Sequence, residues 1–149
     1  MPKEINTNEK IFIAGSNGMV GRAIKKSLIK SGYGLNENNG SVLTPSRSEL
    51  DLSKFHEVES WFLKNKPTIV ILAAAKVGGI HANNSMPADF ILENLKIQTN
   101  VIENAWKANV KRFLFLGSSC IYPKFAQQPI KEDSLLETHL ETTNQWYAI

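Results

Sequence analysis

The chain has 149 residues, 42% of them hydrophobic, and a formal net charge of +3. A chain of this size can bury one core, and no apolar stretch reaches the roughly 20 residues that a membrane-spanning helix needs. Its lysines are spread over predicted helix faces and form no basic run with aromatic residues, so we expect neither nucleic acid nor membrane as a partner. The first residues lack the apolar centre of a signal peptide, which favours a cytoplasmic location.

Cys120 is the single cysteine, so no disulfide can form within the chain, and no spacing of histidine and cysteine is typical of a metal site. We therefore expect no bound metal. The Cys120 thiol is either a small buried side chain or a functional group, and the residues alone leave both open.

A strand followed by glycines opens the predicted fold. Residues 1–9 are polar and predict a loose tail, and residues 10–14 are typical of a buried strand. Glycines follow at positions 15, 18 and 21, and a helix is then predicted from apolar residues at every fourth position, Val20, Ile24 and Leu28. In a parallel α/β sheet, this order of elements presents a helix N-terminus to the pyrophosphate of a dinucleotide.

Each glycine has an expected role in that turn. Gly15 would make the tight bend, Gly18 would let the backbone approach the phosphates, and Gly21 would let helix and strand pack closely. The spacing is GxxGxxG and differs from the usual GxGxxG, so a merely flexible turn stays an alternative for the glycines alone.

The end of the second strand predicts which dinucleotide binds. A polar loop over residues 31–40 leads to a short strand at 42–44. Enzymes of this plan that use NAD usually carry an acid about twenty residues past the glycines, whereas those that use NADP bring an arginine instead. No acid ends this strand and Arg47 follows it, so we predict that Arg47 binds the 2′-phosphate of NADP(H). A solvated surface arginine is the alternative.

A second helix and a third strand follow. Residues 51–53 would cap a helix with the apolar stripe Phe55, Val58 and Phe62. Residues 68–73 are apolar and β-branched, which is typical of a buried strand. The alanines at its end, 73–75, would leave room for a cofactor, unless they only begin the next turn.

The next stretch predicts a loop at residues 76–84 and a long helix from Pro87. The inward-facing residues of this helix are expected to be Phe90, Ile91, Val101, Ile102 and Ala105. Asn94 falls on the same side and needs a hydrogen-bond partner there, which is either structural or close to the cofactor.

A fourth strand is predicted at residues 111–116. Residues 124–143 show no periodicity, as suits an active-site loop, and residues 144–149 predict the first turn of a helix. Strands that alternate with helices through right-handed crossovers predict a doubly wound parallel α/β sheet. We expect the strand order 3-2-1-4.

Together these motifs resemble the extended short-chain dehydrogenase/reductases, a family with a Rossmann-type sheet. The resemblance covers nearly the whole chain and is carried by residues 15–21, 73–80, 83–84, 87–90, 116–123 and 147–149. Outside the glycine motif, these stretches are most similar to members that act on a GDP-sugar. The resemblance implies an NADPH-dependent enzyme that epimerises GDP-4-keto-6-deoxy-D-mannose at C3 and C5, reduces its C4 ketone, and is a homodimer when full length.

The resemblance also implies four groups of cofactor-binding residues, one of them at the end of the third strand. They are Gly15, Ser16, Asn17, Gly18, Met19, Val20 and Gly21 for the pyrophosphate, Arg47, Ser48, Glu49, Leu50, Asp51 and Leu52 for the adenosine end, Leu116, Gly117, Ser118 and Ser119 on the nicotinamide side, and Ala73 and Ala74.

Three residues match the family's catalytic positions. Tyr147 would donate the proton to the C4 oxygen, and Ser118 would hydrogen-bond the same oxygen. A phenol is a poor acid at neutral pH, so the family places a lysine four residues after the tyrosine. Cys120 would exchange protons with the sugar during epimerisation, together with a histidine on the opposite ring face. None of the three histidines of this chain fits that role.

The sequence departs from the family at its end. It stops at Ile149, two residues before the expected lysine, and the C-terminal substrate domain is absent. We therefore expect residues 1–149 to be the NADP-binding part of a longer enzyme and to catalyse no reduction alone. Two alternatives remain, another nucleotide-sugar epimerase or dehydratase of the superfamily, and a dinucleotide-binding module without catalysis.

Overall fold

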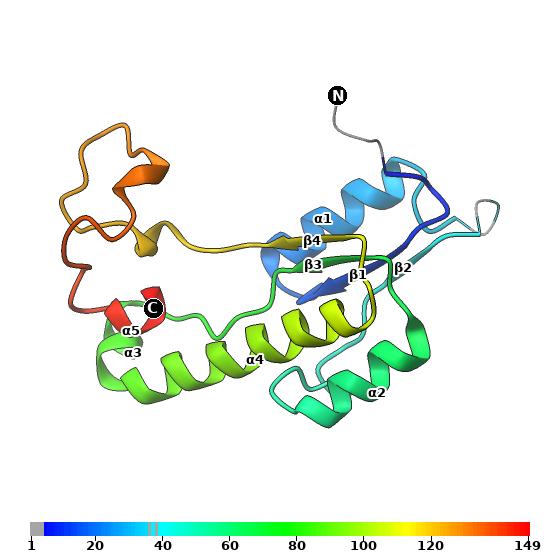
Figure 1. Ribbon diagram of the computed structural model, residues 1–149, viewed down its shortest axis with the longest axis horizontal. Helices are drawn as coiled ribbons and strands as arrows, with labels where there is room; N and C mark the ends of the chain where they lie inside the picture. Colours follow the sequence, from blue (N-terminus) through cyan, green and yellow to red (C-terminus); the bar gives the residue numbers. More distant parts are fainter. Residues whose placement is uncertain (1–4, 36, 38) are drawn as a thin grey trace. The chain divides into compact units, whose positions relative to one another are not determined.

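The computed structural model describes residues 5–35, 37 and 39–149. Among these residues a four-stranded parallel sheet has the order β2-β1-β3-β4, with β1 at Lys10–Ala14, β2 at Ser41–Leu43, β3 at Ile69–Leu72 and β4 at Arg112–Phe115. The longer helices are α1 (Met19–Lys30), α2 (Phe55–Asn65) and α4 (Pro87–Lys107). The shorter elements are α3 (Ile80–Ser85), α5 (Gln145–Ala148) and the 3₁₀ turns η2 (Ser119–Ile121) and η3 (Glu132–Ser134) (Figure 1).

The chain divides into two compact units. The first comprises Met1–Ala75 and Lys96–Leu116 and contains the sheet, α1, α2 and the C-terminal half of α4. The second comprises Lys76–Leu95 and Gly117–Ile149 and contains α3, the N-terminal half of α4 and the segment after β4.

Helices cover both faces of the sheet in the first unit. Successive strand residues point to opposite faces, so each central strand supplies two apolar rows. One cluster contains Phe12, Ala14, Val70 and Leu72 of the strands with Val58 and Phe62 of α2 and Val101 and Ala105 of α4. The other contains Ile11, Ile13, Ile69 and Ile71 with Ile24 and Leu28 of α1. Figure 1 shows α1 on one side of the sheet and α2 with α4 on the other, which confirms the doubly wound α/β class.

The predicted strand order 3-2-1-4 is wrong. Ile11 of β1 lies opposite Val42 of β2 on one side and Ile69 of β3 on the other, so β3 is not beyond β2. Burial explains the difference, because all four residues of β3 are buried whereas all three of β2 are only partly so. The predicted order would have placed the most apolar strand of the chain at an exposed edge.

The segment before β1 also differs from its prediction. Residues 1–4 of the expected tail lie outside the described residues. The Tyr33 hydroxyl donates to the carbonyl oxygen of Ile5 at 2.7 Å, and the Ser41 N–H donates to that of Glu9 at 3.2 Å. The Lys111 ammonium, 2.8 Å from the Glu9 carboxylate, contributes most to lowering the pKa of Glu9. Residues 5–9 are therefore held against the first unit and are not a loose tail.

Two predictions about helices were also wrong. Residues 80–85 form α3 within the predicted loop, where the Asn83 amide side chain donates to the carbonyl oxygens of Gly78 and Gly79 at 2.9 and 3.1 Å. Ile102 of α4 is 45% exposed, although Val101 and Ala105 beside it are buried as expected. In the part of the chain that the structure describes, no helix has the length and hydropathy to cross a membrane.

Candidate active site

Gly15 closes the turn between β1 and α1. Its φ of +86° lies in the left-handed region. A Cβ there would lie 2.7 Å from the carbonyl oxygen of Ala73 and 2.8 Å from the Cα of Ala74. Both the backbone conformation and the end of β3 therefore exclude a side chain at this position.

Gly21 brings the first turn of α1 against this bend. It is buried, and a Cβ on it would overlap the carbonyl oxygen of Gly15 and lie 2.8 Å from the Cα of the buried Ser16. A Cβ on Gly18 would meet only the Gly15 carbonyl oxygen, at 3.3 Å, and the Gly18 N–H donates to that oxygen at 3.0 Å. The backbone is thus closely packed at Gly15 and Gly21 and more open at Gly18.

The N-terminus of α1 is accessible to an anion. Gly18 occupies the N-cap, no side chain caps the helix, and its first turn contains no acidic residue. Asn17 is exposed, as are Met19 (83%) and Val20 (47%), so the predicted inward position of Val20 is wrong. The first N–H groups of a helix lack partners within it and lie at the positive end of its dipole, which suits a phosphate group.

The segment after β2 forms a turn that leaves Arg47 in solvent. The Ser46 backbone N–H and hydroxyl both donate to Glu49 Oε2 at 2.7 Å. The backbone donor contributes most to holding the pKa of Glu49 below its ordinary value. Arg47 and Ser48 are exposed, while Leu50 is buried. The Arg47 guanidinium forms no hydrogen bond or ion pair with another described residue, although its charge is a minor cause of the lowered pKa of Asp51, so it is available to an anionic ligand.

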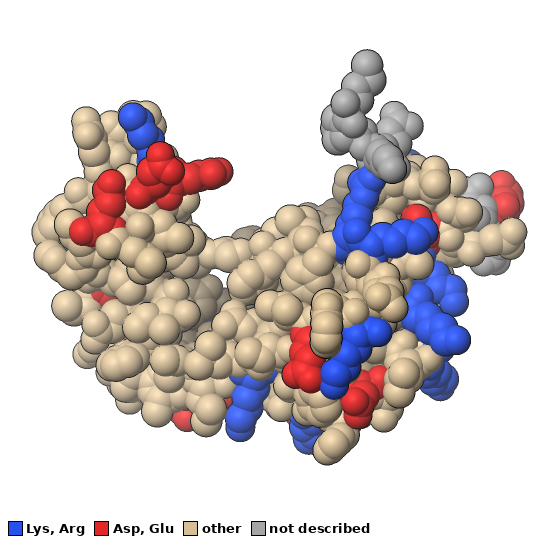
Figure 2. Space-filling view, viewed as in Figure 1, with Lys and Arg blue, Asp and Glu red and all other residues tan. Residues whose placement is uncertain are grey.

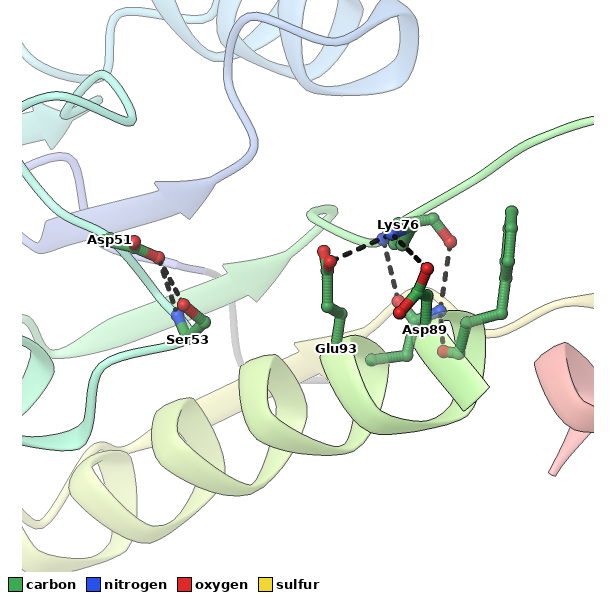
Figure 3. A network of polar contacts seen from close by, with 7 residues as sticks. Asp51, Ser53, Lys76, Asp89 and Glu93 are labelled. Carbon is green, nitrogen blue, oxygen red and sulfur yellow. Dashed lines mark hydrogen bonds and ion pairs between the residues drawn. The ribbon is translucent and has the colours of Figure 1, made fainter. Parts of the chain in front are cut away.

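Asp51 begins a second turn in this segment. Its Oδ1 accepts hydrogen bonds from the Ser53 hydroxyl at 2.7 Å and from the Ser53 N–H at 3.0 Å (Figure 3). These bonds, the hydroxyl first, lower the pKa of Asp51. The N-cap of α2 is Lys54, without a side-chain cap. The prediction that 51–53 caps this helix is therefore wrong, because Ser53 already engages the Asp51 carboxylate. The Leu52 carbonyl oxygen accepts from the Asn100 amide at 2.9 Å.

The strand ends supply small and apolar residues near the glycine turn. The Ala73 N–H donates to the Ala14 carbonyl oxygen at 2.9 Å, and the Leu116 N–H donates to that of Leu72 at 3.1 Å. Ala73 and Ala74 are partly buried, and Gly15 lies directly against both. The first unit thus brings the turn of residues 15–21 together with Ala73 and Ala74.

The predicted catalytic residues all belong to the second unit. Ser118 is the N-cap of η2, and its Oγ accepts from the Cys120 N–H at 3.2 Å. The Ser118 hydroxyl therefore caps this turn as an acceptor, and it donates its own proton to no described residue. The neighbouring Gly117 and Ser119 are exposed.

Cys120 and Tyr147 lie on two segments that pack together. The partly buried sulfur of Cys120 accepts a hydrogen bond from Asn144 Nδ2 at 3.2 Å. Tyr147 lies on α5, which contacts η2, and its ring meets that of Phe90 edge to face at a centroid distance of 6.3 Å. Asn144 was not predicted, since the sequence showed only a residue type common before helices.

Asn94 and Lys76 form a second polar cluster of this unit. The Lys76 N–H donates to Asn94 Oδ1 at 2.8 Å, so the structural partner expected for Asn94 is present. The Lys76 ammonium lies 2.9 Å from Glu93 and 4.0 Å from Asp89, and Figure 3 shows it between the two carboxylates. No sequence pattern predicted these ion pairs, which join a loop to a helix.

Charge is unevenly divided between the units. The second unit has three lysines against six carboxylates, namely Lys76, Lys124 and Lys131 against Asp89, Glu93, Glu132, Asp133, Glu137 and Glu141. The positive excess of the chain therefore resides in the first unit, which contains the glycine turn. Figure 2 shows Lys and Arg over the first unit and a group of Asp and Glu over the second.

Comparison with known proteins gives a consistent set of similarities. The family model described as "NAD dependent epimerase/dehydratase family" matches residues 11–149. The chain is 57% identical to GDP-L-fucose synthase 1 of Arabidopsis thaliana over 140 residues, covering 94% of this chain and 42% of that protein. It is 51% identical to GDP-L-fucose synthase of Sinorhizobium fredii over 149 residues, covering 100% of this chain and 45% of that protein.

A solved structure extends the similarity to three dimensions. The GDP-mannoheptose C4 reductase MlghC from Campylobacter jejuni, with NADP bound, is 40% identical and superimposes with a TM-score of 0.89, covering 97% of this chain and 44% of that one. The chain spans less than half the length of each of these proteins.

Proposed function

The chain belongs to the NAD dependent epimerase/dehydratase family, and from this premise we propose that it is the nucleotide-binding part of a GDP-L-fucose synthase. Such an enzyme epimerises GDP-4-keto-6-deoxy-D-mannose at C3 and C5 and reduces C4 with NADPH to give GDP-L-fucose. The observation that carries the proposal is the 57% identity to a protein of that name over 94% of this chain. Because less than half of that protein is matched, the activity is assigned to the full-length protein that contains these residues.

The residues of the first unit fit a dinucleotide. Side chains are excluded at Gly15 and Gly21, while no side chain caps the α1 N-terminus and its first turn contains no acidic residue. A pyrophosphate would bind there through backbone N–H groups. The unit also carries the positive excess of the chain, which favours a cofactor with several phosphates.

The choice of NADP(H) over NAD(H) rests on Arg47. Its guanidinium is exposed and no acid ends β2, so a 2′-phosphate would gain a bidentate charged partner and a ribose hydroxyl would gain no carboxylate. We assign Ser48, Glu49, Leu50, Asp51 and Leu52 to the adenosine end, where the hydrogen bonds of Glu49 and Asp51 fix the turn that presents Arg47.

For the reduction, bound NADPH would supply hydride to C4. Tyr147 would donate the proton to the C4 oxygen, and Ser118 would orient that oxygen through the hydroxyl proton left unused by its cap. Leu116, Gly117 and Ser119 would lie along the nicotinamide side, and Ala73 and Ala74 would leave space for the cofactor.

For the epimerisation, Cys120 would exchange a proton with the sugar carbon. When a C–H bond breaks at C3 or C5, the electron pair passes into the C4 ketone as an enolate, and the proton moves to the base. Reprotonation on the opposite face inverts the centre. The partly buried sulfur of Cys120 is the group of this chain to which we assign one of these transfers.

The proposal is tested on the full-length protein with NADPH and GDP-4-keto-6-deoxy-D-mannose. We expect NADPH oxidation and formation of GDP-L-fucose, measured by absorbance and by NMR of the product. A preference for UDP- or dTDP-linked keto sugars, or a product with the D configuration at C5, would contradict it.

A second candidate is reduction of a GDP-linked 4-ketone without epimerisation. It is favoured by the similarity to the reductase MlghC at 40% identity. Reaction in deuterated water separates the two, because only epimerisation brings solvent deuterium to C3 and C5. The cytoplasmic location, the homodimer and the assignment of 1–149 to one NADP-binding domain stay predictions.

A further inference from the structure

Asn144 occupies a helix N-cap but does not use its side chain as a cap. It precedes α5 (Gln145–Ala148), and its carbonyl oxygen accepts the Ala148 N–H at 3.0 Å. An asparagine in this position usually accepts a backbone N–H of the first turn through Oδ1. Here no side-chain cap forms.

The Asn144 amide is instead turned toward Cys120. Its Nδ2 donates to Cys120 Sγ at 3.2 Å across 24 residues of sequence. Its Oδ1 is buried and accepts no hydrogen bond from any described residue. A buried acceptor without a partner is unfavourable, so this orientation does not maximise the stability of the fold. Among the described residues, the contact with the sulfur is the interaction that this orientation gains.

We propose that Asn144 is the positioning residue of Cys120 and holds its sulfur so that the thiol proton points away from residue 144 and stays available for exchange with the sugar. This inference rests on the proposed epimerisation. A sulfur atom that accepts an N–H along one lone pair cannot direct its own proton along the same line. The S–H bond must then take another direction, and the sulfur keeps its place in both protonation states.

Asn144 also joins the two chemistry-bearing segments of the second unit. Its backbone belongs to the first turn of α5, three residues before Tyr147, and its side chain contacts the turn η2 that carries Cys120. One residue thus couples the position of the sulfur to the helix that carries Tyr147. The proton exchange at C3 and C5 and the proton donation at C4 would thereby keep a fixed geometry.

The test is Asn144→Asp in the full-length protein. Aspartate keeps the shape of asparagine and is an equally good N-cap, so α5 keeps its preference for a helix. Its carboxylate can only accept, so it draws the thiol proton toward residue 144 and repels the sulfur when that is anionic. Asn84→Asp, at an exposed position of α3, is the matched control for the added charge.

Three measurements separate positioning from a general structural role. We expect solvent deuterium incorporation at C3 and C5 to fall about tenfold or more in Asn144→Asp. Alkylation of Cys120 by iodoacetamide, followed by peptide mass spectrometry, should slow about fivefold. The melting temperature and the NADPH dissociation constant should match those of Asn84→Asp, whereas a merely structural defect would change both.

The outcomes distinguish this inference from the proposed function. Deuterium incorporation in Asn144→Asp at the rate of the control overturns the positioning role, whatever happens to alkylation. If Asn144→Asp fails to fold, Asn144→Ala replaces it. The positioning role then requires the same decrease in deuterium incorporation in Asn144→Ala. If the unaltered protein incorporates no deuterium, the proposed epimerisation fails. In that case, slower alkylation of Cys120 in Asn144→Asp still supports the contact of Asn144 with the sulfur. Unchanged alkylation overturns it.

Discussion

Asn94 hydrogen-bonds both backbone polar groups of Lys76. The Lys76 N–H donates to Asn94 Oδ1 at 2.8 Å, and Asn94 Nδ2 donates to the Lys76 carbonyl oxygen at 3.0 Å. The same Nδ2 donates to the Phe90 carbonyl oxygen at 2.8 Å within α4. One amide therefore holds the first residue of the second unit on the N-terminal half of α4.

Asn94→Ala should destabilise the protein. It leaves the backbone N–H and carbonyl of Lys76 without these partners, so we expect the free energy of unfolding to fall by about 1–3 kcal/mol. Urea unfolding measures it, with the exposed Asn84→Ala as the control, expected within about 0.5 kcal/mol of the unaltered protein. Equal effects of the two variants would contradict a structural role for the Asn94 bonds.

Gly15→Ala should be more damaging than Gly32→Ala, although both residues have a φ of +86°. A Cβ at Gly32 meets nothing within 4 Å, whereas at Gly15 it would lie 2.7 Å from the Ala73 carbonyl oxygen. We expect Gly32→Ala to lower the free energy of unfolding by about 1–2 kcal/mol, the cost of the left-handed conformation alone. Gly15→Ala should exceed this and also weaken NADPH binding, as measured by urea unfolding and fluorescence titration. A smaller effect at Gly15 would show that the contact with β3 is easily relieved.

Arg47→Ala should separate the two dinucleotides. A charge-assisted bidentate contact contributes roughly 1.5–3 kcal/mol, so NADPH affinity should fall about ten- to a hundredfold. NADH lacks the 2′-phosphate and serves as the internal control, with its dissociation constant unchanged. Calorimetric titration of both cofactors tests this. Equal losses of affinity for NADPH and NADH would show that Arg47 acts through its general positive charge and does not bind the 2′-phosphate.

Ser53→Ala should lower the free energy of unfolding most at neutral pH. The Ser53 hydroxyl lowers the pKa of Asp51 in the folded state, so its contribution is complete above the ordinary aspartate pKa of about 4. It is lost as the pH falls further, through the lowered pKa. The stability difference from the unaltered protein should therefore stay constant from pH 7 to about pH 4 and shrink below that in urea titrations. Ser60→Ala, at an exposed position of α2, should show no such trend.

Cys120→Ser in the full-length protein should abolish epimerisation without unfolding the chain. Serine is nearly isosteric, but its hydroxyl is a far weaker acid and base at neutral pH. Deuterium incorporation at C3 and C5 should fall by about two orders of magnitude or more, with NADPH affinity retained. Incorporation at the unaltered rate would leave Cys120 as a packing residue.

The buried strands could be predicted from the sequence, but the order in which they pair in the sheet could not. The run Lys10–Ala14 is the strand that its apolar residues predict, and Gly15 turns where the glycine spacing places the bend. The predicted order paired β3 with β2, whereas β3 pairs with β1. Periodicity reports burial and carries no information about which strand lies next.

Predictions for the site failed where a contact joins distant residues. The bond from Asn144 to Cys120 spans 24 residues, and an asparagine before a short helix predicts a cap and not a sulfur contact. Helix α3 was missed because six residues are too few for a periodic pattern. Val20 continues the fourfold spacing of Ile24 and Leu28, but it is 47% exposed and only the two later residues pack against the sheet.

Strand β4 ends the described sheet, and its central residues are apolar. Phe113, Leu114 and Phe115 are 36%, 50% and 47% exposed, and the strand pairs with β3 on one edge only. Among the described residues, no strand pairs with the other edge of Phe113, Leu114 and Phe115, and an edge of this kind can add a strand of another chain. Self-association of this chain should therefore begin at β4 and should increase with protein concentration.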